Sequence, residues 1–119
     1  MKKKQVQESQ VNLLELIPVQ NIKWKEEEGL IVLLKPKLKY PFFKKHVLPR
    51  LKKPYYKIKL DAVGSFIWEM CCGSFTVKDI GKSLKGKFGD EIEPLYDRLA
   101  LFLQSLEKNR FITYKGINK

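Results

Sequence analysis

The spacing of apolar residues changes once along this chain, near residue 60, and that change limits the folds open to it. Before this point apolar and charged residues alternate: Ile22 and Trp24 are interleaved with lysines, and the run Leu30 to Leu34 follows a Glu-Glu-Glu-Gly segment. Alternation interrupted by a turn indicates a β-hairpin. After this point apolar residues recur at every third or fourth position, which is typical of helices packed on one face. The sequence therefore predicts a sheet followed by helices.

A third strand is predicted at the end of the first half. Tyr56, Ile58 and Leu60 alternate there with Lys57 and Lys59, so one face of the strand is apolar and the other is basic. The preceding segment, residues 35–54, contains four prolines and many basic residues. Because proline cannot continue a helix or a central strand, we expect a long basic loop there.

Three helices are predicted in the second half. Asp61 can cap the first, which precedes Gly73 and carries an apolar face of Val63, Phe66, Ile67 and Met70. The second opens with the capping-box pattern Thr76-Val77-Lys78-Asp79 and ends at Gly89. Its predicted inward residues are Val77, Ile80, Leu84 and Phe88.

The third helix is predicted to run from Asp90 or Glu93 to Asn109, with a short strand after it at 111–114. Its apolar positions keep helical spacing: Ile92, Leu95, Leu99, Phe102, Leu103 and Leu106. The predicted fold class is α+β and winged-helix-like, with a three-stranded antiparallel sheet followed by a three-helix unit.

Length and composition are those of one small globular domain spanning residues 1–119, with a polar and disordered tail at 1–11. With 44% hydrophobic residues the chain is too apolar to be disordered, and no apolar run reaches the ~20 residues that span a bilayer. Polar residues follow the N-terminal lysines where a signal peptide needs an apolar core. We therefore expect a cytoplasmic protein that does not bind membranes.

Positive charge is concentrated in the first half. Residues 1–60 contain 15 Lys or Arg and 5 acids, a balance of +10, whereas residues 61–119 contain 9 and 8, a balance of +1. Such a field attracts acidic partners, and nucleic acid, an anionic membrane surface and an acidic peptide all qualify, so charge alone does not choose among them. Lys57 and Lys59 have two interpretations: a solvated strand edge that discourages aggregation, or an edge that accepts an extended peptide as one more strand.

The sequence gives little support for catalysis. The single histidine, His46, lies in the proline-rich loop, and the adjacent Cys71 and Cys72 are not spaced from it as metal ligands or as a nucleophile and base. Helical spacing favours core packing for Phe66 and Trp68 over an aromatic ligand box. We expect no enzyme activity, no catalytic residue, no metal and no cofactor.

The winged-helix order suggests nucleic acid as one partner, but the third helix opens with Asp90, Glu91 and Glu93. Phosphate is repelled by acids at the position where a recognition helix needs cations. A nucleic-acid-binding regulator that uses the basic segment 35–59 is therefore the alternative function, and nucleic acid is not the expected partner. A structural subunit of a larger complex is a third possibility.

Ordered motifs in the second half resemble the PqqD family, the pyrroloquinoline-quinone synthesis protein D and its relatives, which include the RiPP recognition elements. These motifs are the stretch Lys59 to Glu69, with the pattern L-D-x-x-x-S-x-I-W, then Gly73 with Thr76 to Ile80, then Phe88-Gly89, and the helix end from Leu99 to Phe111. The resemblance covers roughly residues 20–113.

The resemblance implies a non-catalytic peptide chaperone for natural-product biosynthesis. Such a protein binds the leader segment of a ribosomally made precursor peptide and presents it to a modifying enzyme, often of the radical S-adenosylmethionine type. The leader adds beside the third strand and lies against the third helix. Carried over, this implies a peptide site formed by Tyr56, Lys57, Ile58, Lys59, Leu60, Leu95, Arg98, Leu99 and Phe102. The sequence leaves the oligomeric state open, a homodimer included.

Overall fold

The computed structural model describes residues 13–37 and 55–115. The predicted tail at 1–11 lies outside these residues, as do most of the predicted loop and His46. The chain divides into two compact units, one formed by Ile22–Ser65 and the other by Met1–Asn21 with Phe66–Lys119.

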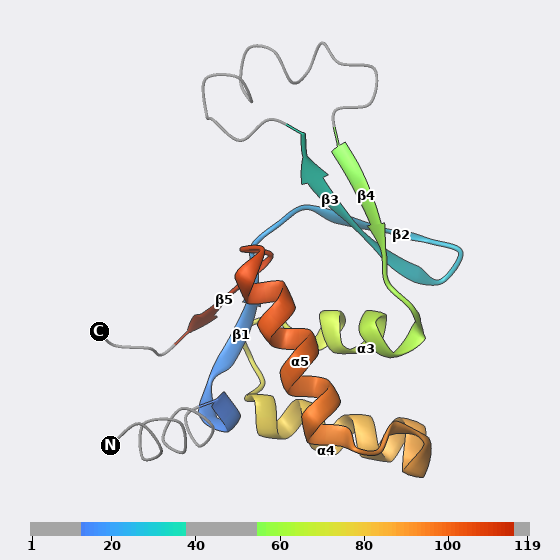
Figure 1. Ribbon diagram of the computed structural model, residues 1–119, viewed down its shortest axis with the longest axis vertical. Helices are drawn as coiled ribbons and strands as arrows, with labels where there is room; N and C mark the ends of the chain where they lie inside the picture. The colour runs from blue at the N-terminus through green and yellow to red at the C-terminus, as the bar shows by residue number, and fades with distance from the viewer. Residues whose placement is uncertain (1–12, 38–54, 116–119) are drawn as a thin grey trace. The chain divides into compact units, whose positions relative to one another are not determined.

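The first unit contains a three-stranded antiparallel sheet in the order β2-β3-β4, as predicted from the alternating pattern. The strands are β2 (Trp24–Glu27), β3 (Leu30–Pro36) and β4 (Tyr55–Lys59) (Figure 1). Glu28 and Gly29 form the β2–β3 turn with φ angles of 55° and 81°. Positive φ at both central residues matches the right-handed twist of the flanking strands.

Strand β3 is longer than the sequence predicts. Lys35 and Pro36, expected in the loop, continue the strand and lie opposite Tyr56 and Tyr55. Pro36 is tolerated because the position of its missing N–H faces the β2 side, where β2 has no residue to pair with it. The sequence pattern alone does not show this, because a proline is an acceptable strand residue only where no partner needs its donor.

A serine completes the sheet at the junction with the first helix, α3 (Ala62–Met70). Leu60 N donates to Ile31 O at 2.8 Å, but the Ile31 N–H donates to Ser65 Oγ at 2.9 Å. Ser65 Oγ in turn donates to Leu60 O at 3.4 Å, and Ser65 is buried. The hydroxyl thus sits between the two main-chain groups that would otherwise pair directly. The predicted cap is also confirmed, since Asp61 Oδ1 accepts from Gly64 N at 2.7 Å.

The second unit contains the rest of α3 and two further helices. Helix α4 (Val77–Phe88) has the predicted capping box: Asp79 N donates to Thr76 Oγ1 at 3.1 Å, and Thr76 N donates to Asp79 Oδ2 at 3.2 Å. Helix α5 (Leu95–Lys108) starts later than predicted, because the 3-10 helix η2 (Gly89–Ile92) and Pro94 precede it. Pro94 occupies the cap position, where no N–H is required.

A second, two-stranded sheet joins the beginning and the end of the described chain. Strand β1 (Ile17–Gln20), which no sequence pattern predicts, pairs antiparallel with β5 (Ile112–Lys115), the predicted final strand. On its other side β1 forms an isolated bridge between Val19 and Cys72. The pairing partners lie far apart in sequence, so a local pattern cannot reveal them.

The core of the second unit comes from all three helices and from β1 and β5. Trp68 is fully buried, which confirms that it packs in the core and does not line an aromatic ligand box. The predicted inward face of α3 included Met70, but Met70 is only half-buried and Trp68 is the buried residue. Phe66 packs edge-to-face against Phe88 with ring centroids 5.9 Å apart. Among the described residues the buried apolar side chains of this unit are Pro18 of β1 and Ile67, Trp68, Cys71, Val77, Ile80, Leu84, Ile92, Leu95, Leu99, Leu103, Leu106, Phe111 and Ile112.

Candidate functional site

Strand β4 lies at one edge of the three-stranded sheet. Its one neighbour among the described strands is β3, so the opposite side of β4 carries no described strand. An edge strand presents main-chain N–H and C=O groups that have no partner within the sheet. Both the ladder register and the side chains decide what this edge can bind.

The register shows which main-chain groups face outward. Leu60 N donates to Ile31 O, so residue 60 points toward β3. Because these directions alternate along an antiparallel ladder, the main-chain groups of Ile58 and Tyr56 also point toward β3. Those of Lys57 and Lys59 point away from it. A bond across the other side of β3, from Leu34 N to Lys23 O at 2.9 Å, fits the same alternation.

The sequence alternation identified the two side-chain faces of β4 but not the direction of its amides. Tyr55 was not among the predicted site residues, but by the same alternation its main-chain groups also point away from β3. No sequence signal identifies it, because the direction of an amide depends on which residue of β3 lies opposite.

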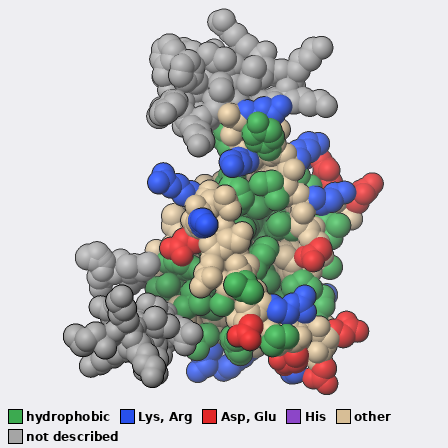
Figure 2. All heavy atoms as spheres, in the orientation of Figure 1, with side chains coloured by type: hydrophobic (Ala, Val, Ile, Leu, Met, Phe, Trp, Pro, Cys, Tyr) green, Lys and Arg blue, Asp and Glu red, His purple; other side chains and the backbone are tan. Residues whose placement is uncertain are grey.

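One face of the sheet is basic. Lys57 Nζ lies 3.2 Å from Glu27 Oε2, and Lys25 Nζ lies 2.7 Å from the same oxygen. The hydrogen bond from Lys25 and then that from Lys57 hold the pKa of the Glu27 carboxyl below its usual value. Lys59 is exposed and forms no ion pair with a described residue. Figure 2 shows Lys and Arg side chains over this sheet, with acidic side chains at its β2–β3 turn, and a mixture of acids and bases over α4 and α5.

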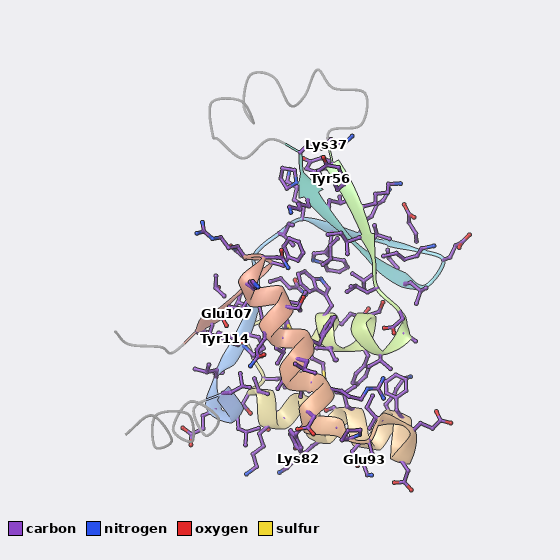
Figure 3. The ribbon with its side chains drawn as sticks, in the orientation of Figure 1. Lys37, Tyr56, Lys82, Glu93, Glu107 and Tyr114 are labelled. Atoms are coloured by element: carbon purple, nitrogen blue, oxygen red, sulfur yellow. The ribbon has the colours of Figure 1, made fainter. Side chains whose placement is uncertain are left out.

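The other face of β4 is aromatic and apolar. Tyr56 is 55% exposed, and Lys37 Nζ lies 5.3 Å from the centre of its ring, within the range of a cation–π contact (Figure 3). Ile58 is half-buried and Leu60 is buried. Of the five predicted strand residues, Tyr56 and the two lysines are therefore the most accessible to a partner.

The four predicted helix residues divide into buried and accessible positions. Leu95 and Leu99 are 4% and 1% exposed and belong to the core of the second unit. Phe102 is half-buried. Arg98 is exposed, and its guanidinium donates to Glu91 O at 3.2 Å. Of the four predicted residues on α5, only Arg98 and part of the Phe102 side chain are thus accessible to a ligand.

The two adjacent cysteines differ in burial. Burial raises the pKa of the Cys71 thiol to about 12, so this thiol is neutral near pH 7, while Cys72 is exposed. No three His, Cys, Asp or Glu side chains among residues 13–37 and 55–115 come together as metal ligands do. None of the helices in these ranges combines the length and apolar character needed to cross a bilayer.

A protein-family model matches this chain. The family model described as Coenzyme PQQ synthesis protein D (PqqD) matches residues 45–112, which is more than half of the chain and runs from before β4 to the start of β5. The chain belongs to the PqqD family. Comparisons with curated proteins and with solved structures found no match.

Membership of the PqqD family confirms the resemblance seen in the sequence. The family is involved in the biosynthesis of pyrroloquinoline quinone and of other ribosomally made, modified peptides, and its members are accessory proteins without catalysis of their own. The match includes β4 and the L-D-x-x-x-S-x-I-W motif but not β2 or β3. A partner within a biosynthetic pathway is therefore expected for this PqqD protein.

Proposed function

We propose that this chain binds the leader segment of a ribosomally made precursor peptide as an added strand at the outer edge of β4. It then presents the bound peptide to a modifying enzyme. In keeping with the family, this enzyme is of the radical S-adenosylmethionine type. The observation that carries the proposal is the register of β4, whose Lys57 and Lys59 main-chain groups point away from β3. Main-chain pairing of this kind supplies affinity that tolerates many sequences.

The charge on the sheet suits an acidic leader. Lys57 and Lys59 are exposed beside the edge, and exposed charges raise the rate of association more than the final affinity. By contrast, the charged residues of α5 are balanced: Asp97, Arg98, Glu107 and Lys108. This helix does not present the cationic face that phosphate binding needs, which favours a peptide over nucleic acid.

A proline substitution tests the edge directly. In Lys57→Pro the lost N–H points away from β3, so the sheet is expected to keep its pairing while an added strand loses a donor and meets the proline ring. Peptides selected from a displayed random library against the wild-type protein should bind Lys57→Pro at least about tenfold more weakly.

Lys57→Gln is the matched control, because it loses the same charge but keeps the N–H. We expect this variant to retain peptide affinity within a few-fold, since an exposed charge contributes little to it. Ile58→Pro provides a contrast: its N–H points toward β3, so this change should lower the melting temperature. A folded Lys57→Pro protein that binds the selected peptides normally contradicts strand addition at this edge.

A further inference from the structure

The two faces of the β4 edge demand different side chains from anything that pairs with it. Side chains in a strand alternate between faces, so Lys57 and Lys59 lie on one face, and Tyr56 and Ile58 lie on the other. Residues opposite each other across a strand pair lie on the same face and within contact distance. A strand added to β4 therefore places every second side chain beside lysine and the intervening ones beside Tyr56 and Ile58.

The lysine face has more positive than negative charge. Lys25 and Lys57 share the single carboxylate of Glu27, at 2.7 and 3.2 Å. Lys59 adds a third positive charge on the same face, because its partner in β3, Val32, lies opposite Lys25 in β2. Three lysines thus face one acid, and an incoming carboxylate can balance the excess.

A second copy of this chain fits the edge poorly. Two β4 strands paired antiparallel in one continuous sheet keep the same faces together, so the Lys57 and Lys59 side chains of one copy oppose those of the other. Like charges directly opposite each other destabilise a strand pair, and lysine on an edge is a common barrier to self-pairing. The charge therefore selects a partner of opposite sign.

We infer that the strand bound at β4 has an alternating sequence, with acidic side chains opposite Lys57 and Lys59 and apolar or aromatic side chains beside Tyr56 and Ile58. This inference rests on the strand addition proposed above and adds the pattern that the ligand carries. Charge steers the acidic positions toward the edge. The apolar positions supply cross-strand packing against an aromatic ring and a β-branched side chain.

Three synthetic peptides test the pattern by fluorescence anisotropy: one alternating Glu and Val, one with the same composition but with Glu and Val in separate blocks, and one alternating Lys and Val. The alternating Glu/Val peptide should bind the wild-type protein at least about tenfold more tightly than the other two. Equal affinity for the two Glu-containing peptides overturns the inference, because net charge alone then explains binding.

A charge reversal locates the effect. Lys59→Glu should weaken the alternating Glu/Val peptide by about tenfold and strengthen the Lys/Val peptide. Lys82→Glu is the matched control, because it makes the same change in net charge at an exposed position on α4. If both variants change the two affinities equally, the preference comes from the overall field and the inference is wrong.

Amide hydrogen exchange followed by NMR separates this inference from the proposed function. Strand addition protects the Lys57 and Lys59 amides, whatever the peptide sequence. Protection by library-selected peptides that lack alternation overturns the pattern but supports strand addition. Protection of the same amides in concentrated protein without peptide shows that a second copy occupies the edge, and that result overturns the inference. If none of these peptides protects the two amides, strand addition itself fails.

Discussion

At the scale of single residues, Ser65 shows how one hydroxyl joins two elements. Its Oγ accepts from Ile31 N and donates to Leu60 O, so it links β3 to the end of β4 at the start of α3. Two buried main-chain groups depend on it, and an unpaired buried polar group costs free energy. Ser65 is the serine of the motif L-D-x-x-x-S-x-I-W. Its hydrogen bonds to the sheet explain why a serine stands there, without a contact to a ligand.

We expect Ser65→Ala to lower the free energy of unfolding by about 1–3 kcal/mol, because it leaves the Ile31 N–H without its acceptor and Leu60 O with one bond fewer. Urea denaturation measures this difference. Ser74→Ala is the control, since Ser74 is exposed, and it should change stability by less than about 0.5 kcal/mol. Equal effects of the two substitutions would show that the Ser65 hydroxyl is not needed by the sheet.

At the scale of elements, helix α4 contains two glycines with opposite surroundings. A Cβ added at Gly81 would lie 2.5 Å from Tyr96 Cε1, whereas one added at Gly86 would have no atom within 4 Å. Gly81 is buried, and Tyr96 on α5 lies over it. Gly81 thus allows the tyrosine ring to approach the α4 backbone, while nothing near Gly86 requires a glycine there.

Alanine substitution at the two positions should therefore have different effects on stability. Gly86→Ala should raise the free energy of unfolding by about 0.5–1 kcal/mol, the gain in helix propensity. Gly81→Ala should be less stable than Gly86→Ala, because the Tyr96 ring must move away and lose its packing. Thermal denaturation should show that a Tyr96→Ala background removes this difference. A Gly81→Ala variant as stable as Gly86→Ala would mean that the Tyr96 ring moves at no cost.

For the molecule as a whole, the distribution of charge along the chain matters more for ligand association than the net charge does. The chain carries a formal charge of +11, and residues 1–60 hold +10 of it. A concentrated positive field raises the encounter rate with an acidic peptide and is screened within about 10 Å at 0.1 M salt. The first half of the chain should therefore dominate association with an acidic ligand.

Stopped-flow measurements should show that the association rate constant of the alternating Glu/Val peptide falls by about tenfold or more as salt rises from low to physiological concentration. The dissociation rate should change much less. An uncharged peptide of alternating Gln and Val is the control, and its association rate should hardly depend on salt. If salt acts mainly on dissociation, steering by the basic half is not the cause.

Elements whose signals are local could be predicted from the order of residues alone. Alternation set the three strands of the sheet, the Thr76 to Asp79 spacing set the capping box of α4, and the 3,4 spacing set the buried face of α5. These features depend on residues a few positions apart, so the pattern contains the necessary information. The motif order likewise predicted the PqqD family.

Groups that meet across long distances in the chain could not be predicted in this way and are known from the fold. The pairing of β1 with β5, the extension of β3 through Pro36 and the hydroxyl of Ser65 between two strands all depend on partners remote in sequence. The same holds for the candidate site. Alternation placed Lys57 and Lys59 on one face, but only their register against β3 determines that their amides point outward, because an amide's direction is set by its hydrogen-bonding partner.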